Sequence, residues 1–181
     1  PMHKVGAHER IFDIGPKTVA LVAKDSDVWG RRQTYVTAAP DEVTGFPFGK
    51  PLSAEEFAIA LQAQFVPGVG DVEYLARLAS SITAEGAPIS EDDGVSQKVT
   101  VRSGIALKDQ VQVKRRVSLA PYRTFREVAQ PVSDFVFRVM TDQQVVKCAL
   151  FEADGGAWRL QAMANVKAWL AQRITDIEVV A

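Results

Sequence analysis

The chain has 181 residues and a formal net charge of -1, with 47% hydrophobic and 24% charged residues. These proportions are those of an ordinary globular protein, and they exclude a disordered chain, a collagen-like chain and a coiled coil. The near-neutral charge also removes the general electrostatic argument for nucleic acid or an anionic membrane as the obvious partner. Cys148 is the single cysteine, so the chain can form no internal disulfide, which fits a reducing cytoplasm.

The sequence predicts one domain preceded by an arm. Residues 1–16 mix charged residues and glycine without periodicity, which predicts a loosely ordered N-terminal arm. Residues 17–181 contain no long linker and no internal repeat, and we expect them to form a single α+β domain. No apolar run reaches the ~20 residues of a membrane span, and no secretory signal is visible. We therefore expect a cytoplasmic protein that does not contact a membrane.

Two strands are predicted near the N-terminus. Residues 17–23 form a short apolar run bounded by turn residues, and residues 33–38 are rich in β-forming residues. The segment 24–32 between them contains Trp29-Gly30 and is predicted to be a hairpin loop. Trp29 is unusual for a loop, and we expect it to act as an interface anchor.

A helical hairpin is predicted next. Ser53 and Glu56 have the spacing of a capping box, in which each side chain satisfies the other's free backbone N–H group. Apolar residues behind them recur on one helical face as far as Phe65. Asp71 is placed to cap a second helix, and the short connection between the two helices predicts an antiparallel pair.

The second half of the chain reads as strands followed by a helix. Alternation predicts strands within 99–119, at 134–140 and at 145–152, then a helix over 157–174 and an edge strand near 177–180. The residues expected to face the core are Val99, Val101, Val111, Val113, Phe135, Phe137, Ala149 and Phe151. The helix is expected to bury a face that contains Leu160, Met163, Ala164, Lys167 and Leu170. Together these elements predict an α+β fold, with a mainly antiparallel β-sheet on which the helical hairpin and the C-terminal helix pack.

The sequence contains no pattern typical of a catalytic site. A nucleophile activated by histidine needs the two side chains together, but His3 and His8 both lie in the predicted arm, and Cys148 lies within a predicted strand. Neither the histidine spacing nor the acidic run 91–93 matches a metal site, and no glycine-rich segment matches a nucleotide fingerprint. Asp154 fits a turn better than a catalytic carboxylate pair with Glu152. We therefore expect no enzymatic activity, no cofactor and no metal.

The strongest local signal is basic. Cations and aromatic side chains gather between residues 114 and 126, where they can hold phosphate groups and stack on a base. The predicted anion- or nucleic-acid-binding residues are Lys114, Arg116, Tyr122, Arg123, Phe125 and Arg126. Arg115 falls on the apolar face of the same strand, and a structural or interface role is expected for it. A solvated face of paired arginine residues remains the alternative interpretation of the cluster.

Four short segments follow one another in an order that resembles a known family: Trp29–Tyr35, Leu52–Ala58, Leu119–Phe125 and Ala149–Trp158. They resemble an uncharacterised family of tailed-phage and prophage proteins, the YfdQ-like domain of unknown function. The likeness covers residues 17–174, and members of the family have a further N-terminal region. The resemblance implies a phage or prophage origin and action in the bacterial cytoplasm, with no established activity and no catalytic residues.

These observations lead to one expected function and two alternatives. We expect a non-enzymatic accessory protein that binds a host or phage partner and forms a homo-oligomer. The first alternative is a nucleic-acid-associated early phage protein that assists replication or recombination. The second is a nucleotide-binding protein that counters host defence by sequestering a signal.

Overall fold

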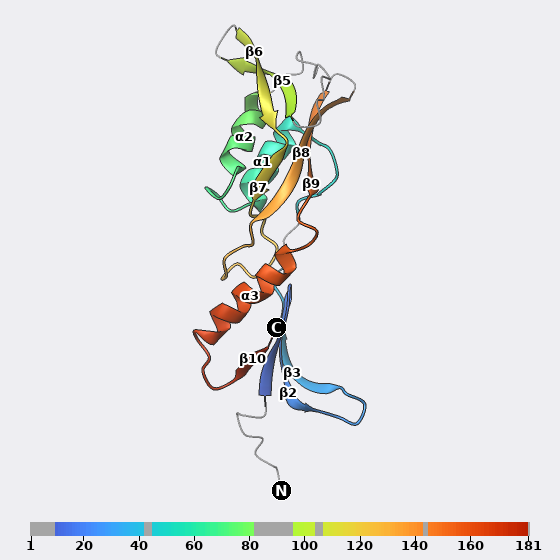
Figure 1. The fold of residues 1–181 in the computed structure, drawn as a ribbon, viewed down its shortest axis with the longest axis vertical. Coiled ribbons are helices and arrows are strands. Elements are labelled where there is room, and N and C mark those ends of the chain that lie inside the picture. The colour runs from blue at the N-terminus through green and yellow to red at the C-terminus, as the bar shows by residue number, and fades with distance from the viewer. Residues whose placement is uncertain (1–9, 42–44, 82–95, 104–106, 143–144, 181) are drawn as a thin grey trace. The chain divides into compact units, whose positions relative to one another are not determined.

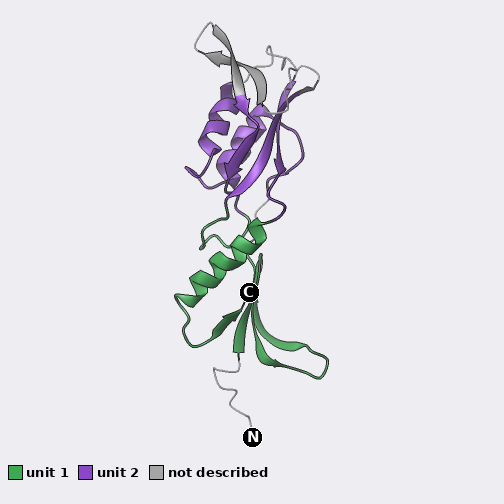
Figure 2. Cartoon of the chain, viewed as in Figure 1, with its two compact units in different colours: residues 1–44, 123–131, 157–181 green, residues 45–122, 132–156 purple. Residues whose placement is uncertain are grey.

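The computed structural model describes residues 10–41, 45–81, 96–103, 107–142 and 145–180. The chain divides into two compact units, shown in different colours in Figure 2. Unit 1 comprises residues 1–44, 123–131 and 157–181, and unit 2 comprises residues 45–122 and 132–156. Helices accompany mostly antiparallel strands, so the predicted α+β fold is confirmed.

Unit 1 is built from one sheet and one helix (Figure 1). The sheet has the strand order β10-β1-β2-β3, and its strands are β1 (Arg10–Gly15), β2 (Thr18–Ser26), β3 (Arg32–Ala38) and β10 (Glu178–Val180). The first three strands are antiparallel, whereas β10 pairs parallel with β1. The helix α3 (Trp158–Ala171) contributes Val166 and Leu170 to a core shared with Ile14 of β1.

The predicted arm over 1–16 is wrong for Arg10–Gly15, which form an inner strand of this sheet. Ile11 and Ile14 are 3% and 2% exposed, so burial of apolar surface holds the strand in place. The segment is short and carries Asp13 between its apolar residues, and for this reason it shows no clear period. His3 and His8 of the predicted arm lie outside the described residues.

The predicted buried face of α3 is right for Leu170 and Met163, which belong to or pack against the core, and wrong for Leu160, Ala164 and Lys167, which are exposed. The buried residues are Trp158, Ala162, Val166 and Leu170, whereas Leu160 is 73% exposed. Steps of four residues advance by only about 40° around a helix, so these four side chains stay within one stripe of about 120°. Apolar residues occur all around this helix, so the helical spacing of apolar residues does not by itself show which face is buried.

Unit 2 has a four-stranded sheet with the order β4-β9-β8-β7 and a separate hairpin, β5-β6. Its strands are β4 (Leu52–Ser53), β5 (Ser96–Ser103), β6 (Leu107–Lys114), β7 (Arg116–Leu119), β8 (Ser133–Asp142) and β9 (Val145–Glu152). Its helices, α1 (Ala54–Gln64) and α2 (Val72–Ser81), form the predicted helical pair and share one hydrophobic core with the four-stranded sheet.

The core of unit 2 confirms part of the predicted inward face. Phe135 and Phe137 are fully buried, and Val113 is 1% exposed. On β9 the prediction chose the wrong face, because Cys148 and Leu150 join the core cluster. Ala149 and Phe151 lie on the opposite face, with Ala149 buried and Phe151 37% exposed. Both faces of β9 carry apolar residues, so alternation in the sequence does not distinguish them. The side chains of Val99, Val101 and Val111 lie outside the described part of the structure.

The two residues predicted to lie at helix starts, Ser53 and Asp71, directly precede α1 and α2. The capping box is present: Ser53 Oγ accepts from the backbone N–H of Glu56 at 3.2 Å, and Ser53 N donates to Glu56 Oε2 at 3.0 Å. At Asp71 the predicted side-chain cap is not formed: its carboxylate accepts instead from the backbone N–H of Ser118 at 3.0 Å and from Lys114 Nζ at 3.2 Å. Asp71 therefore joins the start of α2 to β7.

Candidate functional site

The structure divides the predicted basic cluster between the two units. Lys114, Arg116 and Tyr122 belong to unit 2, and the other three members, Arg123, Phe125 and Arg126, belong to unit 1. Neither unit by itself holds the cluster as one site, so each half is described within its own unit. The anion-binding role of the six residues stays a prediction.

In unit 2, Lys114 and Arg116 have different surroundings. Lys114 Nζ lies 3.2 Å from Asp71 Oδ1 and 5.4 Å from the centre of the Tyr74 ring. Arg116 is exposed on β7, where the register places it opposite Val136 of β8. Val136 in turn pairs with Phe151 of β9, so a cation, an aliphatic side chain and an exposed aromatic ring form one row across the sheet.

Arg115 lies between β6 and β7, and its carbonyl accepts from the backbone N–H of Phe137 at 2.7 Å. Its side chain is half-buried, and its alternate neighbours Val113 and Val117 are both buried in the core of unit 2. Arg115 therefore alternates with two core residues, and the sequence pattern predicted it on the apolar face for the same reason. An interface role for it stays a prediction.

In unit 1, the members of the cluster lie in the segment 123–131 and have different surroundings. The Arg123 guanidinium lies over the Trp158 ring at 4.9 Å from its centre. Phe125 packs against the hydrophobic core of the unit, and Arg126 is exposed. Gln130 braces this segment, because its side-chain oxygen accepts from the backbone N–H groups of Arg123 and Thr124 at 2.9 and 3.2 Å.

The hairpin between β2 and β3 presents Trp29 on an ordered turn. Asp27 Oδ1 accepts from the backbone N–H groups of Trp29 and Arg31 at 2.9 and 2.8 Å, and Asp27 Oδ2 accepts from Arg31 Nε at 3.2 Å. The hydrogen bond from the Arg31 backbone is the main reason that the pKa of Asp27 is lowered. Gly30 adopts a φ of 75°, which favours glycine. The side chain of Trp29 is nevertheless 78% exposed, and that of Val28 is 92% exposed.

The strand β3 is exposed along its whole length. All seven of its residues are exposed, and it forms one end of the strand order in unit 1. Among the described residues, β2 is the only strand that pairs with it. Val36 is 61% exposed. The guanidinium carbon of Arg10 lies over the Tyr35 ring, 4.9 Å from the ring centre. An edge strand of this kind offers unpaired backbone N–H and C=O groups to another strand.

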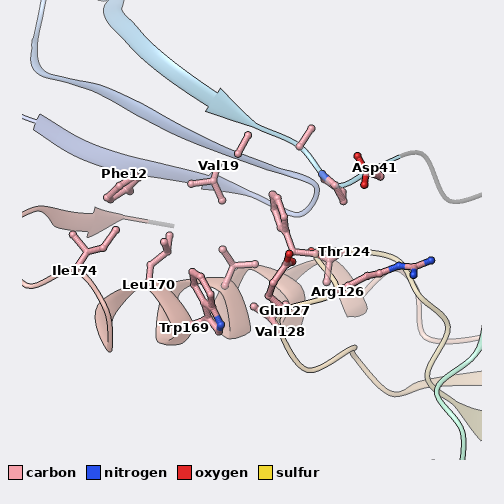
Figure 3. Close-up of a pocket in the computed structure, with 15 residues that line it drawn as sticks. Phe12, Val19, Asp41, Thr124, Arg126, Glu127, Val128, Trp169, Leu170 and Ile174 are labelled. Carbon is pink, nitrogen blue, oxygen red and sulfur yellow. The ribbon is translucent and has the colours of Figure 1, made fainter.

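Unit 1 also contains a cavity of about 540 Å³ between its sheet, α3 and the segment 124–128 (Figure 3). Its wall is mostly apolar and includes the rings of Phe12, Phe125 and Trp169. Charged side chains join the lining at Asp41, Arg126 and Glu127. No sequence motif indicates this cavity, because its residues come from five separate segments of the chain.

Two other side chains that the sequence raised as possible reactive groups, Cys148 and Asp154, have structural surroundings. Cys148 is fully buried, and burial raises the pKa of its thiol to about 12. The Oδ1 atom of Asp154 accepts from the backbone N–H of Gly156 at 2.9 Å, as the turn interpretation predicts. Within the described ranges no three metal-ligating side chains come together, and no helix is both long and apolar enough to cross a bilayer.

The chain matches no protein-family model, no curated protein and no solved structure.

Proposed function

We propose that this chain is a non-enzymatic accessory protein of phage or prophage origin that acts in the bacterial cytoplasm as a homo-oligomer. It pairs with a second copy along β3 and holds a host or phage protein with the tip of the β2–β3 hairpin. The observation that carries the proposal is the exposure of this hairpin, whose apolar side chains lie on an ordered scaffold rather than in a core.

The edge of β3 favours a second copy as its occupant. Arg32 and the register shifts with β2 lie toward the start of β3, whereas the part of the strand paired regularly with residues 19–21 carries no charge and no proline to discourage edge-to-edge pairing. Antiparallel pairing of β3 with β3 of a second copy would be symmetric, so one surface would serve both subunits and the assembly would close as a dimer. It would also cover the exposed side of the strand and bring apolar residues such as Val36 together across the interface.

The tip of the hairpin favours a protein partner. Aromatic residues dominate the energy of protein interfaces, and a segment that is already held in place loses less entropy on binding. The three hydrogen bonds to Asp27 fix the turn before any partner arrives. These bonds fix the backbone that carries Trp29, whereas its exposed side chain would be ordered by the partner.

The homo-oligomer is tested by light scattering over a range of concentrations. We expect the wild-type protein to have twice the monomer mass, and Val36→Lys to raise the dimer dissociation constant at least tenfold, with the melting temperature measured at high dilution, where both proteins are monomeric, unchanged. The control is Val132→Lys, because Val132 is also exposed but belongs to unit 2. A monomeric wild-type protein, or an unaffected dimer in Val36→Lys, would contradict pairing along β3.

Partner binding is tested by affinity capture from phage-carrying bacterial cells, with quantitative mass spectrometry of the retained proteins. A phage or host protein should be retained by the wild-type chain and lost with Trp29→Ala. The control is Leu160→Ala, which removes a side chain of α3 that is 73% exposed. Identical profiles for Trp29→Ala and the wild type would reject the anchor role.

A second candidate function is single-stranded nucleic-acid binding on the outer face of the unit 2 sheet. The row of Arg116, Val136 and Phe151 combines a cation with an exposed aromatic ring, as stacking surfaces for bases do. An electrophoretic mobility shift with single-stranded DNA and RNA tests it: the Arg116→Ala/Phe151→Ala variant should weaken binding, and the salt slope should fall by about one unit. Absence of any shift at low salt would exclude this candidate.

A further inference from the structure

The cavity of unit 1 is partly open to solvent and has a mostly apolar wall. Small-molecule sites in proteins are typically concave and mostly apolar. The space of about 540 Å³ lies within the range of small-molecule binding sites. All its lining residues belong to unit 1, so the site is complete within that unit.

The apolar part of the wall fits an aromatic body. Phe12 of β1, Phe125 and Trp169 of α3 contribute rings, and aliphatic side chains fill the spaces between them. In Figure 3, Phe12, Leu170 and Ile174 lie toward one end of the cavity. Aromatic rings favour one another in stacked or edge-on contacts, beyond the simple burial of apolar area.

The charges in the lining favour a cationic group on the ligand. Asp41 and Arg126 lie at the other end of the cavity in Figure 3, and Glu127 also contributes to the lining. Two carboxylates against one guanidinium leave this charged set with a net negative charge. Arg126 would attract a phosphate or carboxylate group and the two acids would repel it, so the net charge of the set favours an ammonium group.

A buried hydroxyl adds a polar contact beside the cavity. Thr124 is 3% exposed and contributes to the lining, and its Oγ1 atom has no hydrogen-bond partner among the described residues. A buried polar atom without a partner is costly. Thr124 therefore places one polar atom without a described partner in the wall of the cavity.

We infer that this cavity binds a small aromatic amine, with its ring among Phe12, Phe125 and Trp169 and its ammonium group beside Asp41 and Glu127. The inference does not rest on the proposed function: Ala38 at the end of β3 contributes to the lining, but neither Trp29 nor Val36, on which the proposed interfaces depend, does so. It assigns unit 1 a ligand as well as a protein interface.

The experiment compares three probes that share one ring system and differ in the end group. These are 2-(1-naphthyl)ethylamine, 2-(1-naphthyl)ethanol and 1-naphthylacetate, each titrated into the full chain by calorimetry. We expect the amine to bind about two- to fivefold more tightly than the alcohol, as a solvent-exposed ion pair contributes. The acetate should bind more weakly than the alcohol. Adenosine monophosphate, which brings a phosphate, should not bind.

Two classes of variant locate the binding. Val166→Trp fills the cavity from α3, and Ala39→Trp fills it from an exposed position where folding is not at risk. Each should weaken amine binding at least tenfold. The double variant Asp41→Asn/Glu127→Gln should remove the preference for the amine over the alcohol. The control Trp29→Ala should bind the amine as the wild type does, whatever its effect on partner binding.

Three results would overturn the inference. The first is that none of the naphthyl probes binds to the wild-type chain. The second is that the amine binds equally well to Ala39→Trp, which would place it elsewhere. The third is that the acetate binds more tightly than the amine, which would assign the opposite charge to the ligand.

Discussion

The thiol of Cys148 illustrates how burial removes chemistry from a reactive side chain. Cys148 lies on the core face of β9, and burial raises the pKa of its thiol to about 12. Because the thiolate is the reactive form, the folded protein should not react with a thiol reagent such as Ellman's reagent at pH 8. The absorbance change should appear only after unfolding in guanidinium. Rapid reaction of the folded protein would show that the thiol is accessible and that a redox role must be reconsidered.

The capping box of α1 gives a prediction about pH. Hydrogen bonds from the Ser53 side chain and backbone lower the pKa of Glu56 from its ordinary value of 4.5. A carboxyl group whose pKa is lowered by folding stabilises the protein above its unfolded pKa, and this contribution is lost as the pH falls through the folded pKa. Ser53→Ala should therefore lower the free energy of unfolding at pH 7, and by less as the pH falls below the ordinary pKa of Glu56.

The matched control for this cap is Ser80→Ala. The Ser80 hydroxyl donates to the carbonyl of Ala76 at 2.9 Å and not to a carboxylate, so its removal should leave the acid dependence unchanged. Urea unfolding at a series of pH values measures both variants. Parallel stability curves for Ser53→Ala and the wild type would contradict the role of Glu56.

The connection between α1 and α2 gives a prediction at the scale of the element. Gly68 and Gly70 both have positive φ values, 71° and 64°. A Cβ atom on Gly70 would collide with the carbonyl of Ser118 in β7, whereas one on Gly68 would meet nothing within 4 Å. Gly68→Ala should cost only the conformational strain of about 1–2 kcal/mol. Gly70→Ala should cost a further 1–3 kcal/mol, because β7 must move away. Equal melting temperatures for the two variants would show that this contact is loose.

The elements were predictable where one physical signal dominated. The capping box located α1, and the apolar runs located β2, β8 and β9, because burial and backbone hydrogen bonding act there over short stretches of chain. The buried faces of α3 and β9 were not predictable, since both carry apolar residues on more than one side. Only the packing partner selects a face in such elements. The parallel pairing of β10 with β1 joins the two ends of the described chain, and no local pattern signals it.

The candidate sites divide in the same way. Exposure of Trp29 was predictable, because an aromatic residue beside glycine between two strands has no local core to enter. The cavity was not, because β1, β2, the segments 38–41 and 124–128, and the helical segment 166–174 each supply part of its wall. The basic run 114–126 looked continuous in the sequence, but its residues belong to two compact units. Proximity along the chain is therefore a poor guide to the composition of a surface.

At the scale of the whole molecule, the two units share one chain that passes repeatedly from one to the other. The sequence predicts a single domain, and this prediction means that the two units should unfold together. It predicts one unfolding transition, with the same midpoint for Trp169 fluorescence in unit 1 and far-ultraviolet circular dichroism of the entire chain. Replacement of Trp29 and Trp158 by phenylalanine leaves Trp169 as the only tryptophan. Two separate transitions would show that the units unfold independently.

The central claim is that β3 pairs with β3 of a second copy, and hydrogen exchange tests it most directly. The backbone N–H groups of residues 32–38 that do not bond to β2 are exposed to water in the isolated chain, and pairing would protect them. Exchange measured by mass spectrometry should slow in this segment when the protein is concentrated above the dimer dissociation constant. It should stay fast at high dilution and in Val36→Lys at both concentrations. Fast exchange in residues 32–38 at every concentration of the wild-type protein would contradict the account.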